Sequence, residues 1–227
     1  MLKLLGVNHG KVNLQRKDWK MKAKVQWRVI LSVIVICLAW VTAGHGQNEV
    51  YNPCFQIVAD PDGSMWLATM KGAVNIRADG KVVTYDKMKG LKDDLVTQIF
   101  IDRDGSRWFV HAGIFEHRGG TRTAANGVSH LKKDGTIEVF GYHEGLPSGF
   151  VYGITADIDN TKWFATNSGA VHLKANGETE VFTEKNGLPG SNVRHIFIDK
   201  KGLRWFATDE GTVRMDREGK ILAVHPK

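Results

Sequence analysis

The segment DIDNTKWFATNSGAVHL, residues 157–173, contains the unit that decides the fold. An Asp-rich turn leads into an aromatic run centred on Trp163, an Asn-Ser-Gly turn follows, and a second apolar run ends at Leu173. Short runs of β-branched and aromatic residues, bounded by Gly, Asp and Asn, are typical of β-strands joined by tight turns. The segment therefore predicts a β-hairpin.

The same unit recurs four times along the chain. Its landmarks are the tryptophans Trp66, Trp108, Trp163 and Trp205, spaced 42, 55 and 42 residues apart, with glycines and Gly-Leu pairs at matching offsets. A period of about 40 residues with four short strands per unit is the signature of a propeller blade. The sequence predicts an all-β, β-propeller-type array of four four-stranded blades over residues 50–227.

The N-terminal residues 1–46 read as a basic extension followed by a signal peptide. Basic residues up to Arg28 precede an apolar run, Val29 to Val41, and then small and polar residues. This order is typical of a secretory signal, and the run is shorter than the roughly 20 residues that span a membrane. We expect a periplasmic or secreted protein, anchored in the membrane by residues 29–44 if the signal is not cleaved.

Charge and cysteine content narrow the function classes. The formal net charge of +7 arises within residues 1–28, and the rest of the chain is neutral, so no nucleic-acid partner is predicted. The two cysteines, Cys37 and Cys54, leave one in the mature chain, which predicts no internal disulfide. No Cys/His cluster has zinc spacing, so neither a metal nor another cofactor is predicted.

The recurring landmarks are predicted to be structural. A tryptophan at the same place in every unit suits packing between neighbouring sheets, so we assign Trp66, Trp108, Trp163 and Trp205 to the core. The Asp-x-Asp-Gly turns resemble the start of a calcium loop, but Met65 and Lys71 occupy positions that need Gly and Glu. These turns are therefore predicted to be hairpin tips.

Ligand contacts are expected instead in the loops between the second and third strands. These positions vary between copies while the Trp-x-x-Thr frame does not, and the second copy carries a 13-residue insertion there. Insertions in repeat proteins often map to a binding face. The candidate ligand-binding residues are Met70, Lys71, His111, His117, Arg118, Arg122, Asn167, Ser168, Asp209 and Glu210. A solvated loop without function is the alternative for the insertion.

The repeat resembles the two-component regulator propeller repeat of bacterial sensor proteins. The resemblance covers about residues 50–227 and rests on the pattern Asp-x-x-Gly-x-x-Trp-Phe-x-Thr-x-x-Gly-Val, then Gly-Leu-Pro, best kept from Trp163 to Pro189. It implies an exported ligand-binding or sensor domain, often one that recognises carbohydrate. Such sensors usually have seven blades or a multiple, whereas this sequence has four units and no transmitter, so kinase activity is not expected.

Three alternatives stay open from the sequence. Streptogramin-lyase-like propellers share Trp-Phe repeats, and His111, Glu116 and His117 are the compact residues that could serve such a metal-assisted lyase. A non-enzymatic domain is the favoured expectation. A platform for a protein partner is the third reading. The four blades could close on themselves as a small ring, or two chains could form a homodimer that completes a larger propeller; the dimer is favoured because four blades lack a strand that seals a small ring.

Overall fold

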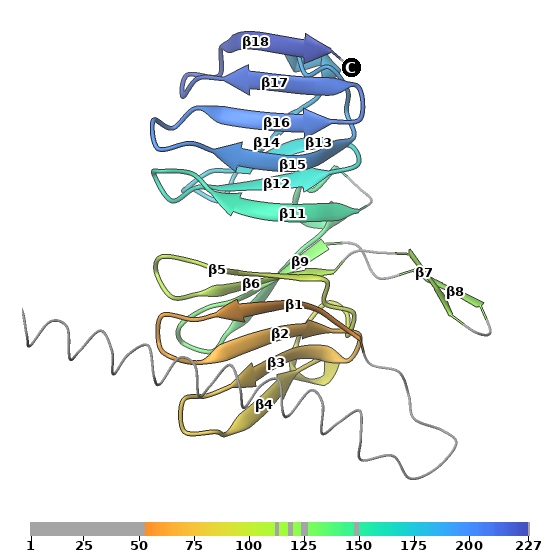
Figure 1. Ribbon diagram of the computed structural model, residues 1–227, viewed down its shortest axis with the longest axis vertical. Coiled ribbons are helices and arrows are strands. Elements are labelled where there is room, and N and C mark those ends of the chain that lie inside the picture. Colours follow the sequence, from red (N-terminus) through yellow and green to blue (C-terminus); the bar gives the residue numbers. More distant parts are fainter. Residues whose placement is uncertain (1–52, 112–113, 118–119, 124–126, 148–149, 227) are drawn as a thin grey trace, which may run out of the picture. The chain divides into compact units, whose positions relative to one another are not determined.

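Figure 1 shows the computed structural model of the chain, which describes residues 53–226 except 112–113, 118–119, 124–126 and 148–149. The predicted signal peptide, residues 1–46, lies outside the described residues. The described part belongs to one compact unit, Asn52–Lys227. Within this part, no helix has the length and apolar character needed to cross a membrane.

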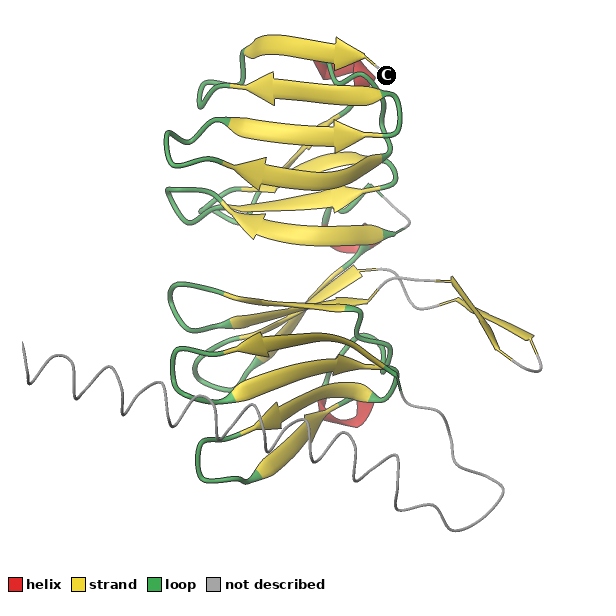
Figure 2. Ribbon diagram, viewed as in Figure 1, coloured by secondary structure: helices red, strands yellow, loops and turns green. Residues whose placement is uncertain are grey.

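Four antiparallel four-stranded sheets make up the unit (Figure 2), which confirms the predicted all-β, propeller-type fold class. Each sheet contains the four main strands of one sequence repeat, and we number the sheets 1 to 4 along the chain. Sheet 1 comprises β1 (Cys54–Ala59), β2 (Met65–Thr69), β3 (Gly72–Ile76) and β4 (Val82–Tyr85), and sheet 2 comprises β5 (Gln98–Ile101), β6 (Arg107–His111), β9 (Gly127–Leu131) and β10 (Ile137–Phe140).

The third and fourth repeats build sheets in the same way. Sheet 3 comprises β11 (Val151–Ala156), β12 (Lys162–Thr166), β13 (Gly169–Leu173) and β14 (Thr179–Phe182), and sheet 4 comprises β15 (Val193–Ile198), β16 (Arg204–Thr208), β17 (Gly211–Met215) and β18 (Ile221–Pro226). The insertion in the second repeat forms a separate two-stranded sheet of β7 (Ile114–His117) and β8 (Gly120–Thr123).

The core is divided into three clusters, each between two successive sheets. Because side chains alternate along a strand, each sheet sends its tryptophan toward the following sheet and the next residue toward the preceding one. Trp66 lies 5.5 Å from Phe109, and Trp163 lies 5.3 Å from Phe206, measured between ring centroids. Such aromatic pairs add stability beyond the area that they bury.

The position of a sheet in the array decides how deeply its tryptophan is buried. Trp66, Trp108 and Trp163 are 1–3% exposed, whereas Trp205 of the last sheet is only partly buried. No cluster of buried hydrophobic residues in the described part of the chain joins sheet 4 to sheet 1. The outer faces of sheets 1 and 4 are thus the two ends of the array.

A buried ion pair reinforces each junction between sheets. The Asp60 carboxylate accepts a hydrogen bond from Trp66 Nε1 at 3.2 Å and pairs with Arg107 of sheet 2 at 2.6 Å. Asp157 does the same for Trp163 and Arg204, and Asp102 pairs with Lys162 at 2.7 Å. A buried carboxylate is tolerated when it is paired in this way, and removal of its partner is strongly destabilising.

Short connectors join the sheets. Each is a single 3₁₀ turn, η1 (Lys87–Lys89), η2 (Tyr142–Glu144) or η3 (Glu184–Asn186), and each ends on a glycine with positive φ. Gly90, for example, has φ 101°, a left-handed conformation that glycine adopts without a Cβ clash. The leucine after each of these glycines is 4% exposed, so the Gly-Leu pair turns the chain and returns it to the core.

Candidate functional site

The two ends of each sheet differ in the turns that they carry. The Asp-Gly hairpin turn between the first and second strands and the turn between the third and fourth strands lie at one end, which we call the hairpin end. The turn between the second and third strands and the connectors lie at the opposite end, which we call the connector end. The sequence places the predicted ligand contacts at the connector end.

Most of the predicted contact residues lie in tight turns at the connector end. The Thr166 hydroxyl donates to the Gly169 carbonyl at 2.7 Å and accepts from the Ser168 N–H at 3.1 Å. The same pattern holds Met70 and Lys71 in sheet 1 and Asp209 and Glu210 in sheet 4. The varying residues are therefore presented on a constant frame.

Two of these side chains already accept hydrogen bonds from residues outside the turns. The Asn167 carbonyl oxygen accepts from the Phe150 N–H at 3.2 Å, and the Asp209 carboxylate accepts from the Asn192 side chain at 2.8 Å. Each contact links a turn to the chain segment that enters its own sheet. These interactions give both residues a structural role at the connector end.

His111 differs from the sequence expectation because it is completely buried. It replaces the threonine of the frame, its Nδ1 lies 3.0 Å from the Leu95 carbonyl, and its Nε2 lies 2.8 Å from the Ser129 hydroxyl. Burial lowers the pKa of His111 to about 4, so the ring is neutral near pH 7. A ring with no exposed surface and two bonded nitrogens is a core residue, not a ligand contact.

The remaining candidates belong to the insertion. His117, Arg118 and Arg122 lie in or beside the β7–β8 hairpin, and their side chains lie outside the described residues. The same holds for Glu116 of the lyase alternative. Among the described residues, no group of three or more His, Cys, Asp or Glu side chains could hold a metal ion.

A pocket of about 480 Å³ lies at the hairpin end, between sheets 1 and 2. Its volume is within the range of small-molecule sites. It combines aromatic, cationic and acidic side chains, and none of the residues predicted from the sequence lines it. The lining consists of Asp62, Ser64, Trp66, Asn75, Arg77, Ala78, Asp79 and Tyr85 from sheet 1 and Arg107, Leu131, Lys132, Lys133 and Gly135 from sheet 2.

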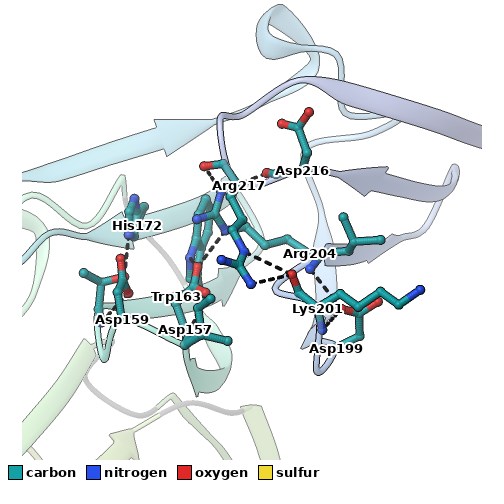
Figure 3. Close-up of polar contacts among 12 residues, drawn as sticks. Asp157, Asp159, Trp163, His172, Asp199, Lys201, Arg204, Asp216 and Arg217 are labelled. Carbon is teal, nitrogen blue, oxygen red and sulfur yellow. Dashed lines mark hydrogen bonds and ion pairs between the residues drawn. The ribbon is translucent and has the colours of Figure 1, made fainter.

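Sheet 3 shows how the repeat fills the corresponding position (Figure 3). The His172 ring stacks on Trp163, with centroids 4.4 Å apart and planes 5° from parallel, and its Nε2 lies 2.8 Å from the Thr161 hydroxyl. Across the strand pair, Glu180 lies opposite His172 and forms an ion pair with Lys174 at 3.1 Å. Burial lowers the pKa of His172, which favours the neutral ring.

Sheet 2 repeats this arrangement. The His130 ring stacks on Trp108 at 3.8 Å, and Lys132 pairs with Glu138, which lies opposite His130. Burial lowers the pKa of His130 as well. In both sheets, an imidazole covers the tryptophan and a glutamate neutralises the lysine at the edge.

Sheet 1 lacks both groups. Asn75 occupies the position of the histidine and donates to the Ser64 hydroxyl at 3.0 Å, while Val83 occupies the position of the glutamate. Arg77 occupies the position of the paired lysine, and it has no ion-pair partner in the described part of the chain. Tyr85 replaces the phenylalanine that packs against the tryptophan in sheets 2 and 3.

Two of the cations on the sheet 2 side of the pocket form ion pairs with acidic residues of the protein. Arg107 binds Asp60 and Asp62, and Lys132 binds Glu138. Partial burial alone would raise the pKa of Asp62, but hydrogen bonds from Ser64 and the nearby Arg107 charge outweigh it and lower that pKa. Asp62 therefore stays ionised beside Arg107, which also pairs with Asp60. Arg77 and Lys133 are the cations of the lining that have no ion-pair partner in the described part of the chain.

Comparison within the repeat could have revealed this site from the sequence. The positions of Asn75 and Val83 hold His and Glu in two other copies, and the repeat spacing alone aligns these positions. The strand register then shows that the two positions face each other. The ligand contacts predicted from the sequence were instead assigned to variable loop positions. The pocket comes from variation on a packed strand face.

Comparison with solved structures gives the class of protein, a β-propeller-type domain. An extracellular domain described as part of a hybrid two component system of B. thetaiotaomicron has 25% identity and a TM-score of 0.64, with 77% of this chain and 23% of that one covered. Virginiamycin B lyase from Staphylococcus aureus has 20% identity and a TM-score of 0.57, with 78% of this chain and 59% of that one covered.

A gluconolactonase from Xanthomonas campestris is also similar in fold, with 16% identity, a TM-score of 0.54 and coverage of 75% of this chain and 61% of that one. The chain thus spans less than two thirds of the length of these proteins. No protein-family profile matches the sequence, and no curated protein matches it. The likeness to the two enzymes shows the fold alone.

Proposed function

We propose that this protein is an exported, ligand-binding propeller domain of the sensor type and that the pocket between sheets 1 and 2 is its binding site. The observation that carries the proposal is the loss of the stacked histidine and its glutamate from sheet 1 alone among sheets 1 to 3. These substitutions face one another across β3 and β4. They border a pocket at the place where, in the other two sheets, a histidine ring stacks on the tryptophan.

The sensor class is supported by the extracellular two-component domain, which is similar to this chain over most of the described sheets. The same likeness and the predicted signal peptide support the expected periplasmic or secreted location. An aromatic wall beside charged and hydroxyl groups suits a small polar ligand such as a sugar. The proposal is binding without turnover, so a bound ligand should be recovered chemically unchanged.

A pocket-blocking variant tests the location of the site. Ala78→Trp introduces a large side chain at an exposed position of the lining, and Ala175→Trp makes the same change at the equivalent position of sheet 3. Calorimetric titration with a panel of monosaccharides, disaccharides and small organic acids identifies the ligands of the wild-type protein. We expect Ala78→Trp to abolish this binding and Ala175→Trp to preserve it.

Deletion of residues 113–125 separates this proposal from the binding loop expected from the sequence. A surface insertion contributes little to closure entropy, so the sheets should keep their stability. We expect binding to persist because the pocket lies at the hairpin end. Loss of binding in the deletion variant, together with full binding in Ala78→Trp, would move the site to the insertion.

A further inference from the structure

We propose that the pocket binds a ring compound that carries one carboxylate, with the ring beside Trp66 and the carboxylate on Arg77. This inference rests on the proposed function and specifies the ligand chemistry of the same site. It comes from a comparison of sheet 1 with the two sheets in which the same position is filled by the protein itself.

The first argument concerns the ring. In sheets 2 and 3, a flat imidazole lies on the tryptophan, with planes 9° and 5° from parallel. In sheet 1, the shorter Asn75 amide reaches the Ser64 hydroxyl, and both residues border the pocket together with Trp66. Aromatic faces bind flat rings and the apolar faces of sugar rings. Trp66 is 3% exposed, so the ligand ring would lie against the partly exposed Tyr85 and the border of Trp66.

The second argument concerns the carboxylate. Lys132 and Lys174 each pair with a glutamate on the neighbouring strand, and Arg77 occupies the same position with Val83 in place of that glutamate. A guanidinium presents two parallel N–H groups that match a carboxylate in a bidentate pair. Replacing lysine with arginine while removing its protein partner favours an external carboxylate at this position.

The third argument concerns charge and hydrogen bonding around the two groups. Arg107 pairs with Asp60 and Asp62, and Lys132 pairs with Glu138, whereas Arg77 and Lys133 have no ion-pair partner in the described part of the chain. A carboxylate on the ligand would give Arg77 the partner that the glutamates provide for Lys132 and Lys174. Tyr85 adds a hydroxyl that the equivalent phenylalanines lack, and it can donate to a polar substituent on the ring.

Two kinds of compound share this chemistry: uronic acid sugars and aromatic carboxylic acids. Titration calorimetry with glucuronate and with benzoate distinguishes the two sources, and glucose and benzyl alcohol are their neutral counterparts. We expect one of the two acids to bind and its neutral counterpart to bind at least about tenfold more weakly. Equal binding of acid and neutral compounds would overturn the inference while leaving the proposed pocket intact.

Two variants test the assigned positions. Arg77→Gln should weaken acid binding about tenfold or more, whereas Lys174→Gln, at the equivalent position of sheet 3, should not change it. The double variant Asn75→His and Val83→Glu restores the groups of the other sheets and should abolish binding. Circular dichroism checks that each variant folds.

Other outcomes contradict the proposal in distinct ways. Acid binding that is unchanged in Arg77→Gln would overturn the assigned carboxylate position. Acid binding that survives both the double variant and Ala78→Trp would overturn the pocket, and with it the proposed function. Absence of binding by every acid tested would overturn the ligand class.

Discussion

Sheets 1 and 3 are built from the same repeat, yet one borders a pocket and the other has a filled interior. Both have a tryptophan that donates to a buried aspartate and meets an arginine from the next sheet. They differ at two facing positions, Asn75 and Val83 in sheet 1 against His172 and Glu180 in sheet 3. A shared frame therefore permits a local change from packing to binding.

Removal of the shared tryptophan should have the largest effect. Trp163→Ala should reduce the free energy of unfolding by about 3–5 kcal/mol, as expected for a large buried aromatic residue. Trp66→Ala should cost about 1 kcal/mol less because no imidazole stacks on Trp66. Denaturant unfolding of both variants measures the difference. A Trp163→Ala protein of unchanged stability would show that the repeat tryptophan has no packing role.

The buried histidine of sheet 2 predicts the next largest effect, which depends on pH. The pKa of His111 is about 4 in the folded chain and has an ordinary value of 6.5. The unfolded chain therefore binds more protons between these values, so stability is complete above pH 6.5 and declines as the pH falls toward 4. The loss should amount to about 3 kcal/mol at most.

The contribution of His111 can be separated from that of its neighbours. Lys92, Asp93 and Asp94 influence its charge, and His130 and His172, whose pKa values are also lowered by burial, add a decline of the same sign. Unfolding at pH 7 and pH 5 should therefore show a smaller pH effect in His111→Gln than in the wild-type protein. The same pH effect in both proteins would contradict this assignment.

Refilling the pocket should have a smaller effect on stability. The double variant Asn75→His and Val83→Glu adds a cross-strand stack and an ion pair with Arg77, which together should stabilise the fold by about 1 kcal/mol. The reverse change in sheet 3, His172→Asn with Glu180→Val, should destabilise it by a similar amount. Thermal unfolding of the two double variants measures both changes. If the Asn75→His and Val83→Glu double variant were less stable than the wild type, sheet 1 could not accommodate the histidine and glutamate in the way that sheet 3 does.

We expect a weak self-association of the protein through the two ends of the array. The uncovered faces of sheets 1 and 4 favour the homodimer expected from the sequence. If that junction repeated the internal geometry, however, Asp199 of one copy would face Met65 of the other, in place of Arg107, Lys162 or Arg204. Light scattering should therefore show a dimer that dissociates on dilution. A constant monomer mass at all concentrations would contradict it.

Much of the fold could be predicted from the sequence because the repeat encodes it locally. The Asp-Gly turns, the tryptophan runs and the Gly-Leu pairs each correspond to a turn, a strand or a connector of the structure. These features depend on backbone conformation and on alternation along single strands, which the sequence shows directly.

The candidate site could not be predicted in the same way because it depends on register. His111 looked like a loop residue beside an insertion, but it is held in the core by Ser129, which replaces a valine of the other copies. Likewise, Asn75 and Val83 are unremarkable alone and become informative only when β3 and β4 are paired. The signal of the site is therefore a pair of substitutions at facing positions on neighbouring strands.

The most direct test of the pocket in sheet 1 is the response of individual tryptophans to ligand. With assigned indole N–H resonances, titration of the acid that binds should shift the Trp66 signal and leave the Trp163 signal unchanged. This result is expected because Trp66 borders the pocket, whereas the His172 ring covers Trp163. Saturable binding with no change at Trp66 would contradict the account.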